Sequence, residues 1–225
     1  GNLTSNWALR RRAQVLEARA QSLISGECRR ITKVASYLMP PRVDMGLYLV
    51  VDVDPVENNL AALGLLRDDG RDPRFHIAVL ESGAPEQERV ALCAVMSSLI
   101  GALADVDAHN QAHENTPEAQ IHAHIYLYEP TEGRSLQEAV ARHLDDPRVR
   151  HGLLNLVRLF PPEDLVPEPE FRGIHHLPAT SLRSVVEQLL GLPVMVSYDL
   201  RQVTTALAAS DDTDSIRAYR PTGPF

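Results

Sequence analysis

The sequence has few cysteines, no long apolar run and no apolar leader segment. Only two cysteines occur among 225 residues, Cys28 and Cys93, and they lie too far apart to make a metal-ligand spacing. So few thiols in a chain of this length indicate a reducing compartment. No run approaches the ~18 apolar residues that a bilayer-spanning helix needs, and the N-terminus does not read as a secretory signal. We therefore expect a cytoplasmic protein with no membrane partner.

Sequence motifs of several enzyme classes are also missing. The chain contains no GxxxxGK loop and no Gly-x-Ser-x-Gly elbow, so it is not itself a P-loop motor and shows no serine-hydrolase signature. The formal net charge is -8, which argues against a strongly basic clamp for nucleic acid. A nuclease is still compatible with this charge, because a metal ion can bridge acidic residues to a phosphate.

The composition is that of a soluble globular protein, with 44% hydrophobic and 23% charged residues. The first residue is Gly rather than Met, which we read as a tag remnant or as the start of a fragment of a longer protein. A chain of this length can form one large domain with extensions. We expect a helical extension over residues 1–40, the main domain over 41–209 and a loosely ordered tail over 210–225.

The apolar pattern predicts an α/β fold with a mixed sheet flanked by helices. Strands are expected over 48–53, 59–66, 75–80 and 119–128, and helices over 6–25, 85–104, 132–144, 147–160 and 180–191. Short turns join the first three strands, so these should be antiparallel, whereas the fourth strand follows a helical crossover. Residues 105–118 read as a polar loop, and the proline-rich acidic stretch 161–173 interrupts the later helices.

The stretch LYLVVDVDP, residues 47–55, runs an apolar strand into two acids spaced one residue apart. Side chains two apart on a strand point to the same face, about 7 Å from each other by strand rise. Asp52 and Asp54 could therefore share a hard cation such as Mg²⁺ or Mn²⁺. The alternative is a polar strand end without a ligand, which Pro55 would also suit.

A second polar stretch, IHAHIYLYEPTEG, covers residues 121–133. Its His and Tyr residues alternate, as expected of one polar-capable strand face, and Glu129 follows at the junction between strand and helix. If the two strands are neighbours, Glu129 faces the same end of the sheet as Asp52 and Asp54. The alternative for Glu129 is an acid at a helix N-terminus that the helix dipole favours.

Histidines cluster in the same region of the sequence, at positions 109, 113, 122 and 124. His109 and His113 could hold zinc if they lay on a helix, and His122 and His124 could do so from one strand face. Pro117 and the polar composition indicate a loop around the first pair. Solvated loop and strand-face histidines are therefore the preferred interpretation.

Four segments together resemble the ribonuclease H-like, DEDD-type exonuclease-like domain of predicted RecB-family nuclease/helicase fusion proteins. VVDVDP stands where that family ends a strand in Asp-x-Glu, and HIYLYEPTEGRSLQEAV stands where it has a Tyr-Glu-Pro step before a helix. LVRLFPPE aligns with a third segment. LPVMVSYDLRQV aligns with a fourth, through Ser197, Tyr198, Leu200 and Arg201. The resemblance covers roughly residues 7–207.

The resemblance implies a ribonuclease H-like fold and a metal-dependent 3′-to-5′ exonuclease. Asp52, Asp54 and Glu129 would hold one or two Mg²⁺ or Mn²⁺ ions on a phosphate, and a metal-bound water would attack the phosphodiester. The implied partners are nucleic acid, as a single strand or a duplex end, and a helicase or ATPase domain of the same parent polypeptide.

The sequence departs from this family at two acids. Arg158 stands where the third segment of the family has an acid, and a cation there would repel a second metal ion. No match to the last acid precedes Phe225, although Asp211, Asp212 or Asp214 could replace it, and Asp164 reads as a loop acid. The alternatives are thus a catalytically degenerate module for nucleic-acid binding or inter-domain scaffolding, or a purely structural α/β domain with solvated acids.

Overall fold

The computed structural model describes residues 12–31, 39–152 and 179–209. Contacts divide the chain into two compact units. We call residues 37–182 the sheet unit, and residues 1–36 with 183–225 the helical unit. The expected domain boundaries near residues 40 and 209 stay a prediction.

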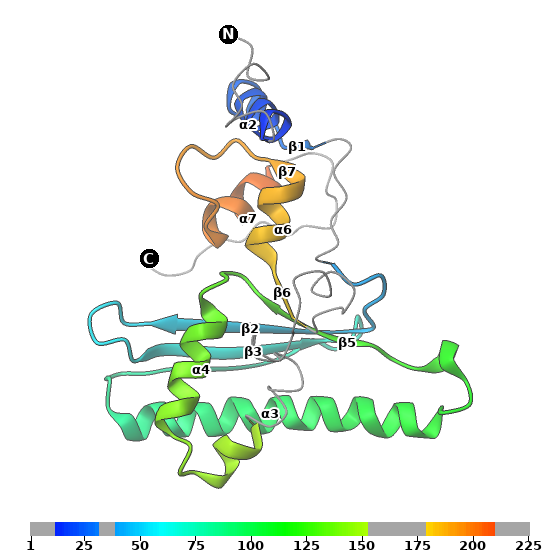
Figure 1. Cartoon of the computed structure of the whole chain (residues 1–225), viewed down its shortest axis with the longest axis vertical. Helices are drawn as coiled ribbons and strands as arrows, with labels where there is room; N and C mark the ends of the chain where they lie inside the picture. The colour runs from blue at the N-terminus through cyan, green and yellow to red at the C-terminus, as the bar shows by residue number, and fades with distance from the viewer. Residues whose placement is uncertain (1–11, 32–38, 153–178, 210–225) are drawn as a thin grey trace. The chain divides into compact units, whose positions relative to one another are not determined.

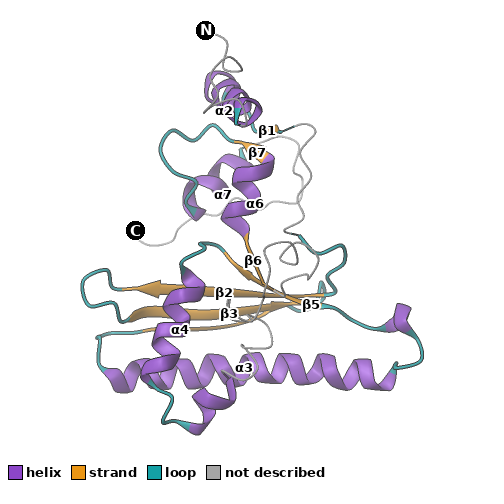
Figure 2. Ribbon diagram, in the orientation of Figure 1, coloured by secondary structure: helices purple, strands orange, loops and turns teal. Residues whose placement is uncertain are grey.

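The sheet unit is built on one five-stranded mixed sheet (Figures 1 and 2). Its strands are β2 (Met45–Val53), β3 (Leu60–Asp68), β4 (Arg74–Val79), β5 (Ala123–Leu127) and β6 (Ala179–Ser181). They lie in the order β4-β3-β2-β5-β6. The first three are antiparallel, and β5 and β6 run parallel to β2 and to each other. The predicted α/β class, the three antiparallel strands and the helical crossover to the next strand are confirmed.

Two helices cover one face of this sheet. α3 (Pro85–Ala112) begins with proline and acidic residues in its first turn, both of which favour a helix start. α4 (Glu132–Arg142) follows β5. The apolar residues of both helices form one buried cluster with alternate residues of β2, among them Leu47, Leu49 and Val51. The strand pattern therefore reads apolar on this face and mixed on the other, because successive side chains alternate.

α3 is longer than the sequence predicted. Residues 105–112, expected in a loop, continue the helix, and the chain leaves it at His113. Val106 is buried one turn beyond Ala102, so the apolar stripe extends into this polar stretch and the tertiary contact outweighs the composition. Pro117 starts a short 3₁₀ turn, Pro117–Ala119, and β5 consequently begins at Ala123 rather than at residue 119.

α3 is also the one described helix that is long and apolar enough to cross a membrane. No membrane-spanning segment was expected from the sequence. Buried core helices meet the same criteria of length and composition, and the apolar residues of α3 pack on the sheet. The helix is therefore weak evidence for a membrane span, and a cytoplasmic location stays a prediction.

The helical unit joins the N-terminal helix to the end of the chain. Its elements are α2 (Ala13–Ser25), β1 (Arg29–Arg30), α6 (Leu182–Leu189), β7 (Leu190–Gly191) and α7 (Leu200–Ala208), and β1 pairs antiparallel with β7. Ser22 Oγ donates a 2.8 Å hydrogen bond to the Gly191 carbonyl. A Cβ at Gly191 would lie 2.8 Å from the backbone of Ala18, so only glycine allows this close approach. The predicted helix over 180–191 is found as α6. The other predicted helix, 147–160, falls partly outside the described residues, which exclude 153–160.

A buried carboxylate connects both helices of the sheet unit to β3. Glu88 of α3 is 2% exposed and accepts four hydrogen bonds. The Leu60 N–H donates at 2.8 Å, two guanidinium nitrogens of Arg142 at 2.9 Å each, and His143 Nε2 at 2.9 Å. Burial by itself would raise the pKa of Glu88, but the hydrogen bonds from Arg142, Leu60 and His143 outweigh it and hold the pKa below its usual value.

Candidate functional site

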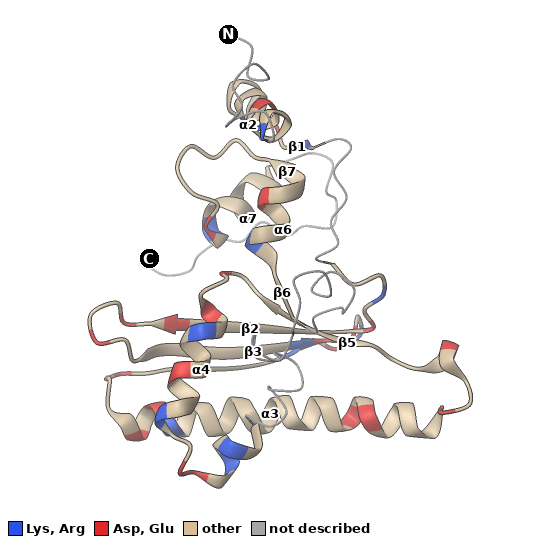
Figure 3. Cartoon of the chain, in the orientation of Figure 1, with Lys and Arg blue, Asp and Glu red and all other residues tan. Residues whose placement is uncertain are grey.

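β2 and β5 are parallel neighbours, so their carboxyl ends meet at one edge of the sheet. Leu49 and Leu127 form the last pair of this ladder, and β2 then continues to Val53. Beyond the end of β5, Glu132 Oε1 accepts the N–H of Val51 at 3.4 Å, and Glu132 Oε2 accepts the N–H of Glu129 at 2.8 Å. Figure 3 shows acidic residues at the end of β2 and the start of α4. The Glu132 carboxylate thus joins the two strand ends.

Asp52 lies next to this junction, on the sheet face opposite the helices. Its side chain is exposed, and Oδ1 accepts the N–H of Val53 at 3.0 Å. Asp52 pairs with Ala62 and Val53 with Leu60, so Ala61 of β3 is the extra residue of a bulge opposite the end of β2. β2 ends at Val53, so Asp54 lies beyond the strand, and the predicted placement of Asp52 and Asp54 on one strand face is wrong.

Asp54 closes the turn that follows β2. Its Oδ1 accepts the N–H groups of Val56 at 2.7 Å and Glu57 at 3.3 Å, and its carbonyl accepts the N–H of Asn58. Asp commonly stabilises a turn in this way. Asn58 takes a positive φ of 57° in the same turn. The Asp54 carboxylate thus stabilises the turn between β2 and β3.

Glu129 and Glu132 form an interacting pair of acids. Burial raises the pKa of Glu132, and the neighbouring charge of Glu129 raises it further. Hydrogen bonds from the N–H groups of Glu129, Val51 and Tyr128 offset this rise only in part. Glu129 itself is half-buried. Two carboxylates of like charge held close together, with a shifted pKa, are a common feature of functional sites.

The described residues contain no group of three or more His, Cys, Asp or Glu side chains placed to hold a metal ion. The structure therefore brings Glu129 together with Glu132, a residue that sequence reasoning missed, and not with Asp52 and Asp54 as a ligand set. The available signal was the spacing of Glu129 and Glu132 in YEPTEG. An acid in the first turn of a helix can reach back to N–H groups preceding it.

The clustered histidines have structural partners. His109 lies in the last turn of α3 and His113 caps that helix, where a loop was predicted. Their rings stack with centroids 4.3 Å apart. His109 Nε2 lies 2.9 Å from the Ala119 carbonyl, and His113 Nδ1 lies 2.8 Å from the His109 carbonyl. His122 pairs with Asp44 at 3.2 Å. These contacts close the end of α3 and the start of β5.

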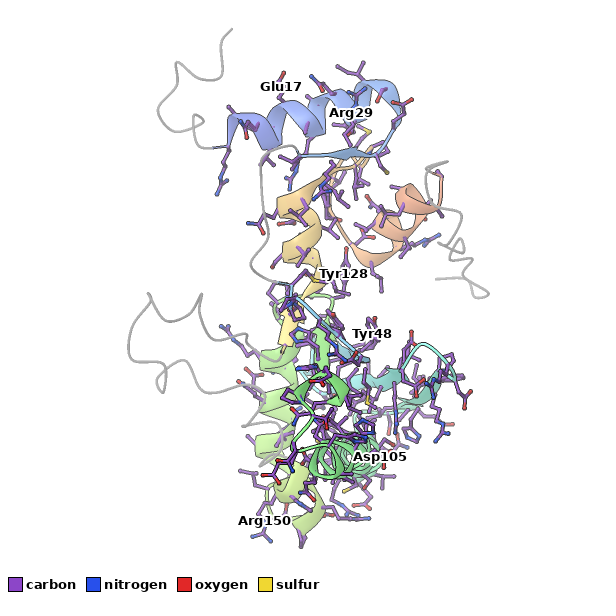
Figure 4. The ribbon with its side chains drawn as sticks, turned by 90° about the vertical axis from the view of Figure 1, so that its right-hand side faces the viewer. Glu17, Arg29, Tyr48, Asp105, Tyr128 and Arg150 are labelled. Carbon is purple, nitrogen blue, oxygen red and sulfur yellow. The ribbon has the colours of Figure 1, made fainter. Side chains whose placement is uncertain are left out.

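An aromatic row crosses the sheet face opposite the helices. Tyr48, labelled in Figure 4, stacks on the ring of Tyr126 with centroids 4.9 Å apart. His124 packs edge-on against Tyr126 at the same separation. His124 is 4% exposed, and its Nε2 lies 2.7 Å from the hydroxyl of Thr180 on β6. The expected polar-capable face of this strand is thus a packed row across β2, β5 and β6.

The fourth segment of the resemblance lies in the helical unit. Asp199 caps α7 by accepting the N–H of Gln202 at 2.8 Å, and Ser197 Oγ donates to Asp199 at 2.8 Å. The Tyr198 hydroxyl accepts the Leu192 N–H at 3.1 Å, and Arg19 lies 4.6 Å from the centre of its ring. These contacts are structural. Arg158, Asp164, Asp211, Asp212 and Asp214 lie outside the described residues.

Comparisons with models of protein families, with curated proteins and with solved structures find no match for this chain. The ribonuclease H-like resemblance, the nuclease activity, the divalent cation, and the nucleic-acid and helicase partners therefore stay predictions. The α/β class with its five-stranded mixed sheet follows from the structure itself.

Replacing Glu132 with glutamine is expected to change how stability depends on pH. Because folding raises the pKa of Glu132, the folded state favours the protonated carboxyl, and stability is lost as pH rises from the unfolded pKa through the folded one. Glu132→Gln keeps an oxygen acceptor but cannot ionise. In urea unfolding at pH 4, 5.5 and 7, the free energy of unfolding of the variant should increase relative to that of the wild type as pH rises. A constant difference across this range would contradict the assignment.

Proposed function

We propose that the sheet unit is a ribonuclease H-like nuclease domain that uses a divalent cation to hydrolyse nucleic-acid phosphodiesters within a larger nuclease/helicase polypeptide. The mixed sheet supports this, because three antiparallel strands are followed by a parallel strand reached through a helical crossover. The observation that carries the proposal is the Glu132 carboxylate, which bridges the ends of β2 and β5 beside Glu129.

The acids at this edge differ in how well they suit a cation. Mg²⁺ is usually held by one or two carboxylates, with water and substrate phosphate completing its coordination. Glu129 suits this chemistry, and a cation bound beside it would offset the burial and the neighbouring Glu129 charge, which together raise the pKa of Glu132. Asp52 is exposed at the same strand end. Asp54 does not fit, because its Oδ1 closes the following turn.

The residues at this edge would have different roles in the reaction. A bound divalent cation neutralises charge on a phosphate and lowers the pKa of a bound water. Glu129 would contact the cation, and water and the phosphate group would complete the coordination. Glu132 would position Glu129, because it holds the Glu129 backbone at 2.8 Å and fixes it to the end of β2. Such supporting groups orient metal ligands and tune their affinity.

Hydrolysis of labelled single-stranded DNA and RNA tests this function. With Mn²⁺ or Mg²⁺, the protein is expected to shorten strands labelled at the 5′ end, and EDTA should abolish the reaction. A strand blocked at its 3′ end should be resistant if the enzyme is a 3′-to-5′ exonuclease. Intact strands of both kinds after prolonged incubation with Mn²⁺ would contradict the proposal.

A non-catalytic ribonuclease H-like module is the second candidate. Two observations favour it: Asp54 is used in a turn, and the described residues contain no cluster of three metal-ligating side chains. Such a module would bind nucleic acid or connect domains. Strand binding that weakens with salt, without any shortening of the strand, would support this alternative.

A further inference from the structure

β4 is an edge strand with an unusual apolar surface. Among the described residues no strand pairs with the edge that faces away from β3. Charged residues stand at its two ends, at Arg74 and Glu81, and none lies between them apart from the titratable His76. Proteins usually protect exposed edges with charge, proline or a bulge, because an unpaired edge is a template for another strand. The middle of β4 has none of these.

The backbone of β4 leaves alternate residues unpaired within the sheet. Leu80 donates its N–H to the Ala61 carbonyl of β3 at 2.9 Å, and His76 pairs with Leu65, two steps along the same ladder from Leu63 and Ala78. Even-numbered residues thus direct their backbone groups toward β3. In an antiparallel ladder the residues between them direct N–H and C=O to the opposite side. Phe75, Ile77 and Val79 therefore present hydrogen-bonding groups along the outer edge.

The side chains of these three residues lie together on the face opposite α3 and α4. Phe75 pairs with Leu66, Ile77 with Gly64, and Val79 with Ala62 in the register of β3 and β4. Phe75 is 78% exposed, Ile77 58% and Val79 72%. Three large apolar side chains exposed in one row mark an interaction surface rather than scattered exposure.

We propose that β4 pairs antiparallel with β4 of a second copy of this chain, about a twofold axis through Ile77. In this register Ile77 faces Ile77 of the second copy, and Phe75 faces Val79 of the second copy. Each of these pairs is of the hydrogen-bonded type, in which two residues exchange both N–H···O bonds. The apolar rows of the two copies then meet on one face and continue into a single cluster.

Charge complementarity favours a second copy as the occupant. Arg74 of the second copy lies across from Leu80, beside Glu81. Glu81 and Glu86 both line the groove between β4 and α3. The present partner of Arg74 is Asp72 at 3.4 Å, with both side chains more than 70% exposed, and such a pair contributes little and can be exchanged. The twofold axis repeats the same contact at the other end, as in isologous dimers.

Sedimentation velocity over about 1–200 μM protein tests this pairing. An interface of this small size should give a reversible dimer with a dissociation constant in the micromolar range. Ile77→Lys is expected to remain a monomer throughout, because it places two ammonium groups against each other on the axis. Val56→Lys is the matched control, since Val56 is 89% exposed in the β2–β3 turn, and it should dimerise like the wild type.

Cross-linking fixes the register. In an antiparallel hydrogen-bonded pair the Cα atoms are about 5.5 Å apart, within the range of a disulfide. Ile77→Cys should therefore form a covalent dimer under mild oxidation, whereas Val56→Cys should not. A wild type that stays monomeric at the highest concentration would overturn the proposal, and so would a dimer that persists unchanged in Ile77→Lys. A dimer lost in Ile77→Lys without the cross-link would overturn the register.

Discussion

Glu88→Ala is expected to destabilise the sheet unit by about 3–5 kcal/mol, the cost of removing one member of a buried ion pair. Glu88 is 2% exposed and accepts hydrogen bonds from Leu60, Arg142 and His143. Truncation leaves the Leu60 N–H and the Arg142 charge without their partner, and it opens a cavity between α3 and α4. A surface acid has no comparable role, because water replaces its partner.

Chemical unfolding followed by circular dichroism measures this loss. The matched control is Asp105→Ala, on the same helix as Glu88. Asp105 is exposed and forms an ion pair with Arg67 of β3 at 2.6 Å. An exposed pair of this kind is worth at most about 1 kcal/mol. Glu88→Gln should fall between the two, because it keeps an acceptor for Leu60. Equal losses for Glu88→Ala and Asp105→Ala would contradict the described network.

Glu129→Gln is expected to reduce metal-dependent hydrolysis by at least about 100-fold, whereas Glu132→Gln should reduce it by about 10–100-fold, as for groups that orient a metal ligand. The difference follows from their proposed roles. Glu129 contacts the cation, and Glu132 holds the Glu129 backbone. The loss in Glu132→Gln should be partly recovered at higher Mn²⁺, because positioning affects cation affinity more than the reaction itself.

The control for both variants is Glu118→Gln. Glu118 lies in the 3₁₀ turn before β5, at the opposite end of that strand from the candidate site. Its replacement makes the same chemical change without touching the edge where β2 and β5 end. Hydrolysis that survives in Glu129→Gln at the level of Glu118→Gln would assign the activity to other residues.

The sequence predicted the sheet better than the helix boundaries. Short turns and alternating apolar residues located β2, β3 and β4 to within three residues, because local turn chemistry and a buried face determine such strands. α3 was predicted too short. The polar composition of 105–112 resembles a loop, and only the packing of Val106 shows that the helix continues.

The candidate site was predicted only in part. The adjacency of β2 and β5, on which the expected position of Glu129 depended, is found in the structure. The end of β2 at Val53 and the use of Asp54 in a turn depend on backbone geometry that a residue pattern does not encode. Glu132 was missed because it lies inside the predicted helix, where an acid in the first turn reads as a dipole contact.

Equilibrium binding of Mn²⁺, followed by electron paramagnetic resonance of the unbound ion, tests the central claim most directly, because it requires no substrate. The wild type is expected to bind Mn²⁺ at the edge formed by β2 and β5, and Glu129→Gln should weaken this binding at least about tenfold, while Glu118→Gln leaves it unchanged. No binding by the wild type at millimolar Mn²⁺, or equal binding by Glu129→Gln, would contradict the claim that these carboxylates form a cation site.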